Sequence, residues 1–116
     1  MMKKLNRKDN LLEYKPERNP DIVWRKLENK HIELDLVNKG FFHFLAQKLL
    51  KKPKISKIEL EEIGSFIWES MDGQKTVQDL SEELEKNFGE KARPTLGRLV
   101  SYLKVLYSND FIRYHQ

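Results

Sequence analysis

Apolar and polar residues alternate along the first half of this chain in a way that predicts β-strands. Ile22–Leu27 is rich in β-prone residues, Glu28–Lys30 supplies turn residues, and Ile32–Leu36 alternates apolar with acidic side chains. Farther along, Ile55–Leu60 alternates again, with Ile58 and Leu60 on one face. The pattern therefore predicts a hairpin followed by a third strand.

The second half changes to helical spacing and predicts three helices. Thr76 and Asp79 have the spacing of a helix N-cap with a shortened capping box, and Gly89 stands where a C-terminal glycine belongs. The apolar positions are Ile63, Phe66, Ile67 and Met71 in the first helix, Val77, Leu80, Leu84 and Phe88 in the second, and Leu96, Leu99, Val100, Leu103, Leu106 and Tyr107 in the third. We expect Leu96, Leu99, Leu103 and Leu106 to pack in the core. Residues 111–114 follow as a short extended tail, which completes an α+β fold.

Two segments stand apart from these elements. Residues 1–20 are polar, carry Pro16 and Pro20 and show no period, so we expect a polar N-terminal arm preceding one domain over residues 21–116. Residues 41–52 form an inserted connector, either a short helix or an irregular apolar segment that ends at Pro53.

Composition narrows the function classes. The length of 116 residues suits one domain, the net charge is only +4, and the absence of cysteine excludes disulfides and thiolate chemistry. The charged start lacks the apolar stretch of a secretory signal, and no apolar run reaches the ~18 residues that a membrane helix needs. We therefore expect a cytoplasmic protein that does not enter a membrane.

The sequence offers few of the residue arrangements that catalysis requires. His31, His43 and His115 are scattered, and none has a second ligand at metal-binding spacing. The glycines form no phosphate-binding loop, and no nucleophile has a base beside it in the sequence. We expect no enzyme activity, no metal and no cofactor.

An ordered set of short motifs gives the chain a family resemblance. Its members are Pro53–Ser56, Ile58–Glu61, Gly64–Trp68, Asp72–Gly73 with Lys75–Val77, Leu80, Phe88–Gly89, Arg98–Val100, Tyr102–Leu103, Leu106 and Asn109–Ile112. In this order and spacing they resemble the PqqD family. The chain departs from the shortest members in its long N-terminal segment, in the insertion at 41–52, and in Asp110, where the family commonly has glycine.

The resemblance implies a winged helix-turn-helix-like fold and a role in peptide recognition. Such domains bind the leader of a ribosomally made precursor peptide and present it to a modifying enzyme, a radical S-adenosylmethionine (radical SAM) enzyme in pyrroloquinoline quinone (PQQ) synthesis. In the family the leader pairs with the third strand, in a cleft whose other wall is the third helix.

The residues are compatible with that role. Capture by strand addition needs an open sheet edge, and Ile55–Leu60 is the last strand of the predicted series. The candidate contacts are Ile55, Ser56, Lys57, Ile58, Glu59 and Leu60 on the strand, and Arg98, Ser101, Tyr102 and Val105 on the third helix. Lys48, Lys51, Lys52, Lys54 and Lys57 favour an acidic peptide.

Two other classes stay open at this point. A winged-helix DNA-binding protein would place its second or third helix in the major groove, although the second helix carries Asp79, Glu82, Glu83 and Glu85, which would repel phosphates. A self-associating adaptor could use Phe41, Phe42 and Phe44 as an apolar patch, and an open strand edge could pair two copies into a homodimer. We expect neither nucleic acid nor membrane as the partner.

Overall fold

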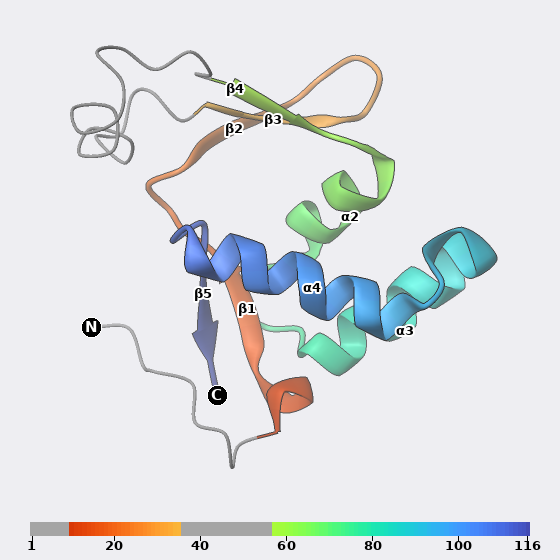
Figure 1. Cartoon of the computed structure of the whole chain (residues 1–116). Coiled ribbons are helices and arrows are strands. Elements are labelled where there is room, and N and C mark those ends of the chain that lie inside the picture. Colours follow the sequence, from red (N-terminus) through yellow and green to blue (C-terminus); the bar gives the residue numbers. More distant parts are fainter. Residues whose placement is uncertain (1–9, 36–56) are drawn as a thin grey trace. The chain divides into compact units, whose positions relative to one another are not determined.

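The computed structural model describes residues 10–35 and 57–116 of the chain (Figure 1). The contacts between residues divide the chain into two compact units, one of Met1–Asn19 with Phe66–Gln116 and one of Pro20–Ser65. The predicted connector at 41–52 lies outside the described residues.

The Pro20–Ser65 unit is built on an antiparallel sheet of three strands in the order β2-β3-β4. Strand β2 spans Val23–Lys26, β3 spans Ile32–Asp35 and β4 spans Lys57–Leu60. At the turn between β2 and β3, Lys30 has a φ of 73°. Ile32 and Leu34 are fully buried, as expected for the central strand of a sheet with one apolar face. The predicted hairpin and third strand are thus confirmed.

A single serine side chain forms hydrogen bonds with both β3 and β4 at one end of this sheet. Helix α2, Glu62–Ser70, follows β4 directly, and its residue Ser65 is 3% exposed. The Ser65 hydroxyl donates to the Leu60 carbonyl oxygen at 2.8 Å and accepts from the Ile32 amide at 2.8 Å. The side chain therefore stands between β3 and β4 and satisfies one backbone group of each strand.

The other unit carries the remaining helices. Helix α3 spans Val77–Phe88, the 3-10 helix η3 spans Gly89–Ala92 and α4 spans Thr95–Ser108. The predicted capping box at the start of α3 is present: Thr76 Oγ1 accepts from the Asp79 amide at 3.0 Å, and Asp79 Oδ2 accepts from the Thr76 amide at 3.0 Å. Three helices after a three-stranded antiparallel sheet confirm the α+β class.

The core of this unit agrees with the predicted helical pattern except at Leu96, which is exposed, and at Trp68, which lies outside the predicted apolar stripe and is fully buried. Its fully buried side chains include Trp68, Met71, Leu80, Leu84, Leu99 and Leu103. Leu96, which we expected in the core, is 40% exposed. Its neighbour Thr95 is buried instead, because the Thr95 hydroxyl donates to the Glu85 carboxylate of α3 at 2.7 Å. This polar contact turns the first residue of α4, rather than the second, toward α3.

The segment before Asn19 differs from the expected polar arm. A 3-10 helix, η1, spans Leu11–Glu13, and strand β1, Lys15–Arg18, pairs antiparallel with β5, Ile112–His115 (Figure 1). The other side of β1 meets residues 71–73, where the Gly73 amide donates to the Pro16 carbonyl at 3.0 Å. Tyr14 and Pro16 are buried. Strand β1 could not be predicted from its own polar sequence, because the segments that stabilise it are distant in the chain.

The side chain of Arg18 joins β1 to the end of α2. Its Nη1 donates to the Trp68 carbonyl at 2.9 Å and to the Glu69 carbonyl at 2.8 Å. The last carbonyls of a helix have no partner within the helix, and a cation also suits the negative end of its dipole. Arg18 therefore satisfies two of these groups and holds β1 beside the helix end.

Helix α4 ends in a left-handed turn. Asp110 has a φ of 63°, the Asp110 amide donates to the Tyr107 carbonyl at 3.1 Å, and the Phe111 amide donates to the Leu106 carbonyl at 2.8 Å. This is the hydrogen-bond pattern of a Schellman motif, accompanied by the buried side chains Leu106 and Phe111. The turn directs the chain from α4 into β5.

Candidate functional site

Strand β4 forms one edge of its sheet. Within the described residues it pairs only with β3, in the register Asp35 to Lys57 and Ile32 to Leu60. Its side chains alternate as predicted, since Ile58 and Leu60 are half-buried whereas Lys57 and Glu59 are exposed. The other two strand candidates, Ile55 and Ser56, lie outside the described residues. An unpaired edge presents backbone N–H and C=O groups that another strand can bind.

On the polar face of this sheet, the Glu59 carboxylate takes part in two hydrogen bonds. Glu59 accepts from Asn29 Nδ2 at 3.2 Å and lies 2.7 Å from His31 Nδ1. The hydrogen bond with His31, and next the one from Asn29, lowers the pKa of Glu59. Lys57, at the other end of β4, makes no ion pair with any residue the structure describes. Lys57 is therefore an exposed cation at this end of β4, opposite Asp35 of β3 in the strand register.

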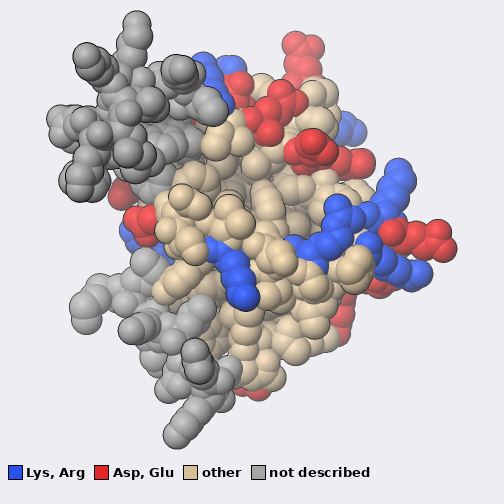
Figure 2. All heavy atoms as spheres, viewed as in Figure 1, with Lys and Arg blue, Asp and Glu red and all other residues tan. Residues whose placement is uncertain are grey.

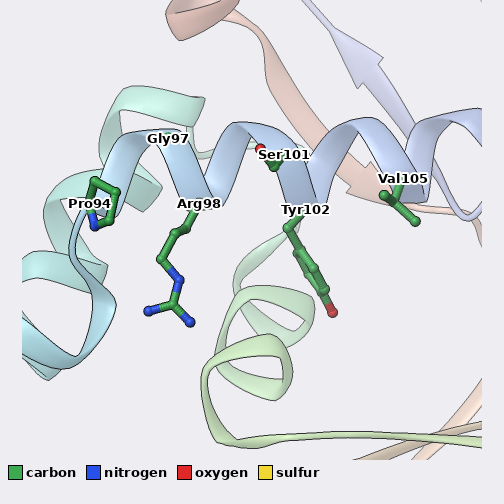
Figure 3. A pocket seen from close by; sticks show the side chains of 6 residues that line it. All are labelled: Pro94, Gly97, Arg98, Ser101, Tyr102 and Val105. Atoms are coloured by element: carbon green, nitrogen blue, oxygen red, sulfur yellow. The ribbon is translucent and has the colours of Figure 1, made fainter.

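The four candidate residues on α4 lie together on its outer face. Arg98, Ser101, Tyr102 and Val105 line a shallow, open hollow of about 630 Å³, along with Pro94 and Gly97 (Figure 3). Val105 is 60% exposed, the most exposed of the large apolar side chains Val23, Leu96 and Val105. The sequence analysis missed Pro94 and Gly97 as members of this surface. Pro94 precedes Arg98 by four residues and Gly97 precedes Ser101 by four, and this spacing on one helix face is the signal that could have found them.

The hollow combines an aromatic side chain with a positive charge. Burial raises the pKa of Tyr102 to about 12, so its hydroxyl keeps its proton at neutral pH. Arg98 Nη1 donates to the Lys91 carbonyl at 2.7 Å. Thr95–Ser108 contains Arg98 and Lys104 and no acidic residue, and Figure 2 shows the surface over the middle of α4 as mostly uncharged, broken by Lys and Arg.

Helix α3 has a different surface. Its outer face includes an open hollow of about 340 Å³ lined by Lys75, Asp79, Glu82, Glu83 and Lys86. The Lys75 and Glu83 side chains form an ion pair at 3.1 Å, and Gln78 donates to Glu82 at 3.0 Å. These charged groups bind one another and offer little apolar area, so the α4 hollow is the better candidate for a ligand with apolar side chains.

No group of three or more His, Cys, Asp and Glu side chains is placed to hold a metal ion in residues 10–35 and 57–116. Among the described helices, none combines the length and the apolar character needed to cross a membrane.

Comparison with known proteins identifies the family. The model of the family "Coenzyme PQQ synthesis protein D (PqqD)" matches residues 49–112, more than half of the 116-residue chain. No curated protein and no solved structure matches the chain. The matched region contains β4, α2, α3, α4 and the first residue of β5. The chain therefore belongs to the PqqD family of coenzyme PQQ synthesis proteins.

Proposed function

We propose that this chain is a non-catalytic, peptide-binding protein that holds the leader of a ribosomally made precursor peptide and presents it to a separate modifying enzyme. The enzyme would be of the radical SAM type, as the family's connection with PQQ synthesis suggests. The observation that carries the proposal is that β4 has only one partner strand among the described residues, so the backbone groups on its other side can pair with an added strand. The outer face of α4 supplies a second surface for side-chain contacts.

Each surface contributes a different part of recognition. On β4, backbone hydrogen bonds give affinity without regard to sequence, and the alternation of Lys57 and Glu59 with Ile58 and Leu60 gives the edge a polar and an apolar side. On α4, Tyr102 offers a large amphipathic ring and Arg98 a cation, the residue types that often dominate binding energy at interfaces. Ser101 and Val105 complete this surface.

Titration of ¹⁵N-labelled protein with synthetic leader peptides, encoded by the genes that neighbour this one, tests both surfaces. We expect the amides of Lys57–Leu60, together with Ile55 and Ser56, and the amides of the exposed face of α4 to shift. Strand addition also predicts slower hydrogen exchange along β4 in the complex, because its outward N–H groups become bonded. Shifts confined to α3 or to η1 would contradict this assignment, as would a spectrum that no tested peptide changes.

The charge at Lys57 predicts an effect on association rate. Lys57→Glu should slow the binding of an acidic leader about twofold to fourfold at low salt, the size expected when a charge ~10 Å from a carboxylate is reversed in water. The effect should fade in 0.5 M salt, because the Debye length then falls to a few ångströms. Stopped-flow fluorescence with a labelled leader peptide measures the association rate at low salt and in 0.5 M salt.

Lys30→Glu is the matched control for this experiment. It changes the net charge by the same amount, but Lys30 lies in the turn between β2 and β3, whereas Lys57 stands opposite Asp35 in the β3–β4 register, at the other end of the hairpin. We expect Lys30→Glu to leave the association rate nearly unchanged. Equal slowing by both variants would mean that only net charge matters and that the β4 edge does not steer the peptide.

A further inference from the structure

The outer face of α4 has a low point at Gly97. Side chains four residues apart form ridges on a helix, and here one ridge consists of Pro94, Arg98 and Tyr102, and the next of Gly97, Ser101 and Val105. The second ridge is low at Gly97 and Ser101 and high at Val105. Figure 3 shows the side chains of Arg98 and Tyr102 extending in the same direction, between Pro94 and Val105 at the two ends of the row.

The packing of the described residues does not require a glycine at this position. Apart from its chain neighbours and the adjacent helix backbone, a methyl group placed on Gly97 would meet no described atom within 4 Å, and the residue is not in the left-handed region where glycine is favoured. Within a helix, glycine is less favourable than alanine because it loses more backbone entropy. Gly97 thus weakens α4 without any gain in packing among the described residues, and its effect is to deepen the hollow.

Charge indicates what kind of ligand fits this hollow. Arg98 forms no ion pair with a described carboxylate, although the nearby Arg93 is paired with Glu85. Lys104 likewise has no ion-pair partner among the described residues, and no acidic side chain occurs in α4. A ligand that brings a carboxylate to Arg98 would gain a charge-assisted hydrogen bond.

The length of the stripe fits a short extended peptide. From Pro94 to Val105 the helix rises roughly 16 Å at ~1.5 Å per residue, which about five residues of an extended chain would cover. Alternate side chains of such a chain are ~6.7 Å apart, close to the ~6 Å between Gly97 and Ser101. Consecutive inward-pointing side chains can therefore rest on these two small residues.

We propose that Gly97 determines specificity: its missing side chain admits a bulky apolar side chain of an extended peptide, while Arg98 binds a carboxylate of the same peptide. This inference rests on the proposed peptide-binding function and names the class of segment that the site selects. The apolar side chain at Gly97 would lie beside Pro94 and the alkyl part of Arg98, and Ser101 would stay small enough to let the next side chain approach Tyr102 and Val105.

Selection from a displayed library of random twelve-residue peptides tests the inference with the full chain. The parent protein should enrich peptides that carry Phe, Leu or Trp close to Asp or Glu. Gly97→Leu fills the hollow and should reduce affinity for the enriched peptides about tenfold, the penalty typical of a blocked apolar pocket. Arg98→Glu should replace the enrichment of acidic residues with enrichment of Lys and Arg.

Stability measurements separate this effect from misfolding. Gly97→Ala should raise the melting temperature by about 3 °C through its higher helix propensity while it weakens binding, so stability and affinity change in opposite directions. Ser108→Leu, which adds the same side chain to an exposed position of α4 outside the hollow, should leave the selected peptides unchanged.

The outcomes distinguish two kinds of failure. If the parent protein enriches peptides but Gly97→Leu enriches the same ones with equal affinity, the role of Gly97 is wrong and the peptide-binding function stands. If the parent protein enriches no peptide at all, the proposed function fails and this inference fails with it.

Discussion

Tyr14→Ala is expected to lower the free energy of unfolding by about 3 kcal/mol, at the lower end of the range for a buried aromatic side chain replaced by alanine. Tyr14 is only 4% exposed, and its ring lies 5.8 Å from that of Tyr114 in β5. Its hydroxyl also accepts from Gln116 Nε2 at 3.3 Å. Removing the ring leaves a cavity beside the β1–β5 pair. Urea unfolding followed by circular dichroism measures the loss.

Two control variants make this result specific. Glu13→Ala changes the exposed preceding residue and should alter stability by no more than about 0.5 kcal/mol. Tyr14→Phe keeps the ring and should cost about 1 kcal/mol or less, the value of one hydrogen bond. If Tyr14→Ala unfolds at the same urea concentration as the parent protein, the residues before Asn19 behave as the polar arm that the sequence predicted.

Ser65→Ala is expected to destabilise the protein by about 2 kcal/mol. The loss of the hydroxyl leaves the Ile32 amide and the Leu60 carbonyl without this partner, and a buried polar group that loses its hydrogen bond typically costs about 1–3 kcal/mol. Hydrogen exchange adds a local readout, because the Ile32 amide should lose protection first.

Ser70→Ala is the matched control in the same helix. The Ser70 hydroxyl donates to the Phe66 carbonyl, four residues earlier, at 2.8 Å. Such a bond within the helix contributes little, so we expect a change of no more than about 0.5 kcal/mol. Equal losses for the two variants would show that the position of Ser65 between the strands has no special value.

The position of Ser65 also bears on the register of β4. A slip of one residue would turn Ile58 and Leu60 to the polar face and bring Lys57 and Glu59 to the apolar one. Because Ser65 bonds Leu60 and Ile32 together, it fixes the register at the end where β4 leads into α2. The same contact therefore determines which backbone groups of the edge strand would face the peptide of the proposed function.

The elements with strong periodicity could be predicted from the sequence. The hairpin, β4, α2, α3 and α4 all have apolar positions at the spacing of their own structure, and the cap at Thr76 was evident from local residue types alone. Strand β1 could not be predicted in this way. Lys15–Arg18 contains one proline and three charged residues, and it is a strand because β5 and residues 71–73 bind it from either side.

The candidate site was predictable to a similar degree. Helical spacing alone brings Arg98, Ser101, Tyr102 and Val105 to one face, because these residues are three and four positions apart. The role proposed for Gly97 could not be predicted, since a glycine in a helix can equally reflect close packing against a neighbour. Only the structure shows that no described side chain packs against Gly97 from another part of the chain.

Asp110 explains why a departure from the family pattern leaves the end of α4 intact. What this place demands is a positive φ, which Asp110 adopts at 63°. Glycine meets that demand without strain, and aspartate and asparagine are the other residues that meet it most readily. At this position Gly, Asn and Asp can therefore all support the same left-handed backbone conformation. The identity of the residue alone does not tell whether two chains have that conformation.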